Sequence, residues 1–199
     1  MATEQCAAER YDIVAVASSA GGIQGLGVFL GALGTDFPVP VLIVQHLDPR
    51  HRTVIVEVLA RRMSLPVKLA EDGEHAKPGV VYVAPPDRHL LVGPEGALSL
   101  SRSGLVHFLR PCADLLFESV ADAYGPRAIA CVLTGTGSDG AMGVDAVRAR
   151  GGTVIAQDPE TAEFKGMPEA AVGTGAVDFV LPLEEIAAVV RGLVETKRQ

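Results

Sequence analysis

The chain alternates short, fully apolar runs with stretches that have the spacing of an amphipathic helix. Residues 13–17 and 39–44 are rich in β-branched side chains and apolar on both faces, which is typical of parallel strands covered by helices. Between them, apolar residues recur at helical spacing from Ile23 to Leu33, and Gly34 ends the pattern. This alternation predicts an α/β fold with a doubly wound, mostly parallel sheet and helices on both of its faces.

The same alternation continues to the end of the chain and is interrupted once. Between Pro78 and Leu109, three short runs are separated by proline, glycine and serine, which predicts an inserted antiparallel hairpin region. The runs are 80–83, 89–92 and 97–100. The other predicted strands are 66–69, 128–133, 153–157 and 177–181, and the other predicted helices are 53–63 with Thr53 as cap, 113–124, 141–150, a short one near Pro168 and one from Leu183.

The length of 199 residues is that of one domain with a single sizeable core. We predict a catalytic domain over 11–195, preceded by an extension over 1–10 and followed by a charged tail over 196–199. Residues 1–10 lack the apolar segment of a signal peptide, and the longest apolar runs have the length of strands. These features predict a cytoplasmic protein that is not inserted in a membrane.

The charge and the cysteines exclude several classes of partner. A formal net charge of -7 argues against nucleic acid, because binding phosphates requires a basic face. The three cysteines, Cys6, Cys112 and Cys131, form no metal-binding spacing and fit a reducing compartment. Cys131 lies in an apolar run and is predicted to be an inert core residue. We therefore expect no metal and no cofactor.

Three predicted strands end in unusual sequences, at the edge of the sheet where α/β proteins place their ligands. After the first strand, Ser18 and Ser19 precede Ala20 and two glycines. Small residues there permit a sharp turn that exposes a hydroxyl beside the amides of a helix N-terminus, where an oxyanion could be stabilised. The alternative is that one of the serines only caps the following helix.

The second strand ends in Gln45 and His46. A histidine at this edge could accept a proton from a nucleophile on the neighbouring strand, although a structural histidine is the alternative. The remaining histidines lie in loops or hairpins and are interpreted as structural, with His89 the one that could reach the rim of a cleft. They are His51, His75, His89 and His107.

The third strand is followed by the glycine-rich run 133–143, which opens a helix and contains Asp139. The carboxylate could orient an imidazole, with a helix cap and a phosphate-binding turn as alternatives. The run matches neither GxGxxG nor a P-loop, and no lysine follows. Serine, histidine and aspartate at the ends of strands in one sheet suit a nucleophile, a base and an orienting group. Their order in the chain, without a GxSxG motif, disfavours a lipase-type esterase.

The chain resembles the catalytic domain of the chemotaxis protein-glutamate methylesterases, from about Tyr11 to Val194. The similar motifs are Ala17-Ser18-Ser19-Ala20-Gly21-Gly22, Val44-Gln45-His46 and Leu133-Thr134-Gly135-Thr136-Gly137-Ser138-Asp139-Gly140. Supporting matches are the runs 82–89, 110–117 and 166–168. The resemblance implies a cytoplasmic serine hydrolase of signal transduction, which demethylates glutamates on the cytoplasmic helices of chemoreceptors. Some members of the family also deamidate glutamines.

Residue by residue, the resemblance implies Ser19 as nucleophile, His46 as base and Asp139 as the orienting carboxylate. The backbone amides of Ala20 and Thr136 would stabilise the oxyanion. Many members have threonine and methionine at these two positions, a change that a backbone donor tolerates.

Arg88 and Arg110 are candidates for contacts with the acidic face of a substrate helix, with surface ion pairs as the alternative. A separate receiver protein is a further expected partner, because the best-known members carry a receiver domain. Two other functions stay open at this point: a non-catalytic binding module on the same fold, and a nucleotide-binding α/β protein.

Overall fold

A computed structural model describes residues 11–47 and 53–196. Its main sheet has seven strands in the order β3-β4-β2-β1-β7-β8-β9, and every pair of neighbours is parallel. The strands are β1 (Ile13–Ser18), β2 (Val41–Gln45), β3 (Val67–Leu69), β4 (Val81–Val83), β7 (Ala128–Val132), β8 (Thr153–Gln157) and β9 (Phe179–Leu181). The prediction of a doubly wound, mostly parallel sheet is confirmed.

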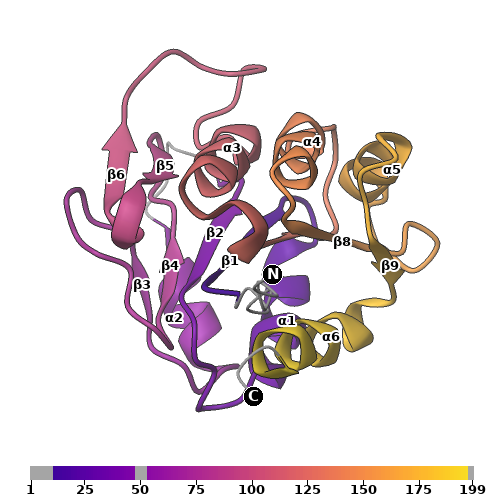
Figure 1. Ribbon diagram of the computed structural model, residues 1–199, viewed down its shortest axis with the longest axis horizontal. Helices are drawn as coiled ribbons and strands as arrows, with labels where there is room; N and C mark the ends of the chain where they lie inside the picture. The colour runs from indigo at the N-terminus through magenta and orange to yellow at the C-terminus, as the bar shows by residue number, and fades with distance from the viewer. Residues whose placement is uncertain (1–10, 48–52, 197–199) are drawn as a thin grey trace, which may run out of the picture.

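Helices cover both faces of this sheet, three above it and three below it in Figure 1. The helices are α1 (Gly22–Ala32), α2 (Ile55–Ala60), α3 (Ala113–Tyr124), α4 (Ala141–Ala149), α5 (Gly166–Gly173) and α6 (Leu183–Thr196). The first strand shows how the two cores are divided. Ala15 and Ala17 pack with the helices α3, α4 and α5, whereas Val14 and Val16 pack with α1, α2 and α6.

A two-stranded antiparallel sheet lies beside α3. It consists of β5 (His89–Val92) and β6 (Leu98–Ser101), which are joined through a short 3-10 turn (Pro94–Gly96). The predicted antiparallel insertion is therefore present, but its predicted extent is wrong at residues 80–83. Strand β4 pairs in parallel with β2 and β3, because its alternating side chains are buried in both cores of the main sheet.

Helix α2 is shorter than the predicted helix over 53–63. The Thr53 hydroxyl accepts a hydrogen bond from the amide of Ile55 (3.2 Å), and the helix ends at Ala60. Cys131 is fully buried, as predicted. The predicted extension over 1–10, His51 and most of the predicted tail lie outside the described residues, and the domain boundaries stay predictions. No helix within 11–47 or 53–196 is long and apolar enough to cross a membrane.

Candidate functional site

The chain changes the side on which it adds strands between β1 and β7, and the three predicted motifs meet at this point. From β1 the chain adds β2 on one side, while β7 and β8 extend the sheet on the other side. Such a reversal opens a crevice at the carboxyl ends of the strands. The Ser19 amide donates to the carbonyl of Thr134 (3.0 Å), and the His46 amide donates to the carbonyl of Ser18 (3.2 Å). These bonds hold the three turns together.

The two serines of the first motif have different surroundings. Ser18 is fully buried, and its hydroxyl donates to Oε1 of Gln45 (2.7 Å). Ser19 is half-buried and lines a cavity of about 370 Å³ together with His46 and Asp139. Helix α1 has Gly21 as its N-cap and no side-chain capping bond. The interpretation of either serine as a helix cap is therefore wrong.

Gln45 organises the turn, a role that the sequence did not reveal. Its amide nitrogen donates to the carbonyls of Ser19 (2.8 Å) and His46 (3.0 Å), while its oxygen accepts the Ser18 hydroxyl. A Cβ at position 22 would lie 2.0 Å from that oxygen, so Gly22 provides the space that the side chain occupies. The backbones that carry Ser19 and His46 are thus joined by one buried amide.

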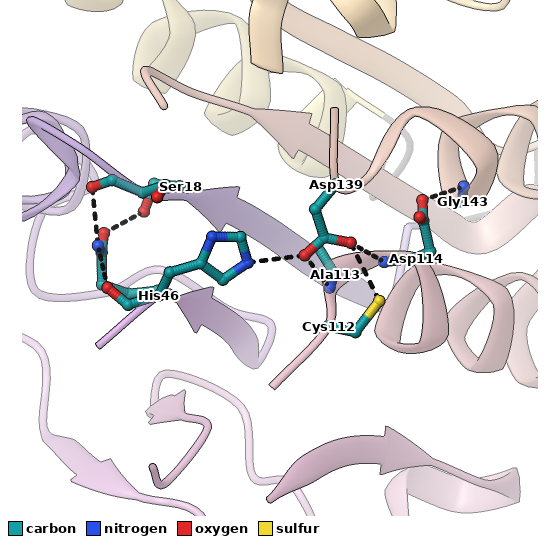
Figure 2. Close-up of polar contacts among 9 residues, drawn as sticks. Ser18, His46, Cys112, Ala113, Asp114, Asp139 and Gly143 are labelled. Atoms are coloured by element: carbon teal, nitrogen blue, oxygen red, sulfur yellow. Dashed lines mark hydrogen bonds and ion pairs between the residues drawn. The ribbon is translucent and has the colours of Figure 1, made fainter. Parts of the chain in front are cut away.

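Asp139 is the most heavily bonded group of the site (Figure 2). Its carboxylate lies 2.7 Å from Nε2 of His46 and accepts the amides of Ala113 (2.7 Å) and Asp114 (3.1 Å). The thiol of Cys112 is a fourth partner at 3.0 Å. The interpretation of Asp139 as the cap of its own helix is wrong, because α4 has Gly140 as its N-cap. The carboxylate instead binds the N-terminus of α3.

All of these partners favour the ionised carboxylate. Burial alone would raise the pKa of Asp139, but the hydrogen bonds from His46, Ala113 and Cys112 outweigh burial and hold the pKa below its ordinary value of 3.8. Because the ionised group only accepts, Nε2 of His46 carries the proton in this bond. Nδ1 of His46, which has no hydrogen-bond partner within the described residues, then keeps its lone pair and could act as a base.

The other acidic and thiol groups beside Asp139 are protonated more readily than usual. Burial and the neighbouring Asp139 raise the pKa of the Cys112 thiol to about 12, so this thiol stays a donor. Burial also raises the pKa of Asp114, which accepts the amide of Gly143 (2.8 Å). Potential metal-binding atoms of Cys112, Asp114 and Asp139 lie within 4.8 Å of one another. A protonated thiol is a poor metal ligand, which favours the hydrogen-bonded role of the cluster.

Of the two predicted oxyanion donors, Thr136 lines the same cavity, and Ala20 directly follows Ser19 in the chain. Within the described residues, the amides of Ala20 and Thr136 donate to no protein acceptor. The loop that carries Thr136 is fixed by Phe164 and by the first turn of α5. The Gly135 amide donates to the carbonyl of Phe164 (2.9 Å), and the Met167 amide donates to the carbonyl of Gly135 (2.9 Å). The two amides are therefore available on a backbone that is held in place.

Ser19 and His46 face one cavity without a direct bond. In the part of the chain that the structure describes, no hydrogen bond joins the Ser19 hydroxyl to the imidazole. Catalytic hydrogen bonds of this kind often tighten only when substrate binds. A second cavity of about 360 Å³ shares His46 and Leu109 with the first and extends past Asp87 and Arg110. Together the two cavities form a groove across the histidine.

The remaining predicted residues lie around this groove in different ways. The Arg110 guanidinium binds Oδ1 of Asp87 through Nε (3.0 Å) and Nη2 (2.6 Å), and Arg88 is half-buried nearby. His89 is fully buried, its Nε2 is bonded to the carbonyl of Gly104 (3.2 Å), and it lines neither cavity. His107, which was interpreted as structural from its place in a loop, lines the cavity of Ser19.

Comparisons with known proteins show similarity over most of the chain. Residues 14–190 match the family model described as CheB methylesterase. A relative from Leptospira interrogans is 40% identical over 177 residues, which are 89% of this chain and 92% of that protein. The protein-glutamate methylesterase/protein-glutamine glutaminase 4 of Myxococcus xanthus is 43% identical over 179 residues, and this chain spans about half (51%) of its length.

The fold has a solved counterpart. The crystal structure of the Thermotoga maritima CheB methylesterase catalytic domain superposes with a TM-score of 0.88 at 38% identity. The superposition covers 94% of this chain and 100% of that one.

Proposed function

The chain belongs to the CheB methylesterase family, and we propose that it hydrolyses methyl esters of glutamate side chains on chemoreceptors. The observation that carries this proposal is the buried, ionised Asp139, which is bonded to His46 in a cavity that Ser19 also lines. We further propose that the protein acts in the cytoplasm, on the cytoplasmic helices of these receptors. A separate receiver protein is the proposed regulator.

In the first half of the reaction, the Ser19 hydroxyl attacks the δ-carbonyl carbon of the methyl ester. Nδ1 of His46 accepts the hydroxyl proton, while the Asp139 carboxylate holds the ring through Nε2 and stabilises the imidazolium. The amides of Ala20 and Thr136 donate to the oxyanion, and each such donor contributes on the order of 3–4 kcal/mol to the transition state. The C–O bond to methanol then breaks, and His46 returns the proton to the departing oxygen.

In the second half, water replaces methanol. His46 removes a proton from this water, which attacks the acyl group on Ser19, and collapse of the intermediate restores both the serine and a free glutamate. The groove that continues past His46 gives water and the leaving group a place beside the imidazole. The scheme uses side chains and backbone amides of this chain alone.

Deamidation of glutamine is a second activity that the same groups support. The name of the Myxococcus xanthus relative includes protein-glutamine glutaminase. An amide would pass through the same acyl-enzyme on Ser19, with ammonia in place of methanol as the leaving group. His46 would protonate the departing nitrogen.

Methanol release from receptor cytoplasmic fragments tests the function directly. Fragments with radiolabelled methyl esters on their glutamates should release labelled methanol when the protein is added. Labelling of Ser19 with a serine-reactive phosphonate, mapped by mass spectrometry, reports the nucleophile independently of the substrate. A protein that neither releases methanol nor reacts with the phosphonate would instead be a binding module on this fold.

Replacing Gly135 with alanine should disturb the oxyanion loop. The added Cβ would lie 2.3 Å from Sδ of the buried Met167 and 2.9 Å from Cβ of Ser19, the proposed nucleophile. We expect kcat for methanol release to fall about 100-fold, since a displacement of 1 Å has that effect. Overpacking should also lower the free energy of unfolding by about 1–3 kcal/mol.

Gly192→Ala is the matched control for this substitution. Gly192 lies exposed in α6, and a Cβ there would meet nothing within 4 Å. The change should leave kcat unaltered and raise the free energy of unfolding by about 0.5–1 kcal/mol, as alanine does in a helix. Equal kcat values for the two variants would show that the position of Gly135 does not matter to catalysis.

A further inference from the structure

An apolar turn projects from the rim of the groove. Val106 and Leu109 form an antiparallel bridge with reciprocal amide-to-carbonyl bonds of 3.1 and 2.8 Å. Phe108, one of the two residues between them, is 92% exposed, and Leu105 just before the bridge is 56% exposed. We call residues 105–109 the rim turn. It presents a large apolar side chain to solvent in a protein that otherwise buries most of its aromatic residues.

The backbone of the rim turn is strained. Both central residues have positive φ, 49° at His107 and 65° at Phe108. Positive φ at both central positions of a two-residue hairpin loop is the geometry of a type I′ turn, which favours Asn-Gly. A bulky residue such as phenylalanine rarely adopts it. Strain of this kind is typical of functional segments that the surrounding structure holds in place.

The base of the rim turn is held by side chains that bond three consecutive backbone carbonyls, those of residues 102–104. Nη1 of Arg110 donates to the carbonyls of Arg102 (3.3 Å) and Ser103 (2.8 Å). Nε2 of His89 is hydrogen-bonded to the carbonyl of Gly104 (3.2 Å). Asp87 fixes the same guanidinium from its other side. Because His89 and Arg110 hold residues 102–104, the strained turn keeps its position and the Phe108 side chain stays exposed to solvent.

The rim turn stands directly beside the proposed catalytic groups. His107 and Leu109 line the cavity that contains Ser19, while Leu105, Phe108 and Leu109 line the adjoining one. Both cavities include His46. A polypeptide whose side chain reaches Ser19 would therefore pass over this turn.

Positive charge surrounds the same rim. Hydrogen bonds from Arg110, together with the charges of Arg102 and Arg88, lower the pKa of Asp87. Arg110 binds Asp87 directly and also donates to the carbonyl of Arg102, and Arg88 follows Asp87 in the chain, so three arginines lie at this rim beside one carboxylate. A partner that fits this rim has an apolar stripe beside acidic residues.

We propose that the rim turn is the docking contact for the helix that carries the esterified glutamate. Phe108 and Leu105 pack on an apolar stripe of this helix, and Arg88 and Arg102 face its acidic side chains. This inference rests on the proposed methylesterase function and adds to it a way of selecting substrates. The helix is recognised by its surface next to the ester, while Ser19 recognises only the ester itself.

Phe108→Gly tests the docking contact. The glycine removes the side chain and fits the positive φ, so the turn and the melting temperature should be preserved. We expect kcat/KM for methanol release from receptor fragments to fall about ten- to a hundredfold through KM, as for the loss of one buried aromatic side chain. Hydrolysis of p-nitrophenyl acetate, which has no helix, should fall far less. Phe179→Ala, at an exposed aromatic residue of the edge strand β9, should change neither rate.

Two failures would have different meanings. If the parent releases methanol and Phe108→Gly keeps the parental KM on receptor fragments, the docking contact is wrong and the methylesterase function stands. If the parent hydrolyses p-nitrophenyl acetate but no receptor fragment, both the proposed substrate and the docking contact are overturned. Equal losses of activity on the two substrates would also contradict docking, because they would mean that Phe108 affects the catalytic groups themselves.

Discussion

Ser19→Ala should lower kcat for methanol release by on the order of 10⁶-fold, as removal of the nucleophile does in other serine hydrolases. The side chain lines the cavity beside His46 and carries the only hydroxyl proposed to attack the ester. The backbone that positions it is held by bonds from its own amide and to its carbonyl, and alanine keeps both. The variant should therefore fold like the parent and bind the same receptor fragments.

Ser18→Ala is the matched control, one residue away. The Ser18 hydroxyl is buried and donates to Gln45, and its removal leaves the amide oxygen of Gln45 without a partner among the described residues. We expect the free energy of unfolding to fall by about 1–3 kcal/mol. More than about a tenth of the activity should survive, since one neutral hydrogen bond contributes on the order of 1 kcal/mol and a tenfold rate change requires 1.4. The reverse pattern would make Ser18 the nucleophile.

Asp139→Asn should damage both catalysis and stability. The four groups bonded to the carboxylate are all donors. The NH₂ group of an asparagine side chain would therefore face N–H or S–H donors in place of an acceptor. We expect a loss of about 10⁴-fold in kcat, because the His46 tautomer is no longer fixed. The free energy of unfolding should fall by about 3 kcal/mol, the value of a hydrogen-bonded buried charge.

The effect of Asp139→Asn on stability should depend on pH. The folded pKa of Asp139 lies below its unfolded value, so its contribution is complete above about pH 4 and is lost as pH falls through the folded pKa. Denaturant titrations of parent and variant should differ most near neutral pH and converge in acid. Asp114→Asn is the control, because burial raises the pKa of this side chain instead of lowering it. A pH-independent difference would contradict an ionised Asp139.

Much of this architecture was accessible from the sequence because parallel strands leave a strong local signal. The apolar runs that became β1, β2, β7 and β8 are continuous, and each is followed by a helix. The signal failed at β4, which has only three residues and lies among turns that resemble those of a hairpin. In the sheet β4 lies between β2 and β3 and is parallel to both, an order that the local pattern of side chains does not encode.

The candidate site was also predictable only in part. Ser19, His46 and Asp139 each follow a strand of the sheet, and the structure brings them to one cavity. The groups that hold them were not predictable in the same manner. Gln45 acts through carbonyls, and Cys112 reaches Asp139 across 27 positions of the chain. Their roles depend on backbone atoms and on contacts that no periodicity encodes.

The bonds from the amides of Ala113 and Asp114 to the proposed catalytic carboxylate also make the first turn of α3 a built-in spectroscopic reporter. The chemical shifts of these two amide protons should follow the ionisation of Asp139, and their exchange with solvent should quicken whenever the carboxylate moves away. The state of the proposed catalytic groups could thus be read by NMR in the resting protein, without a substrate.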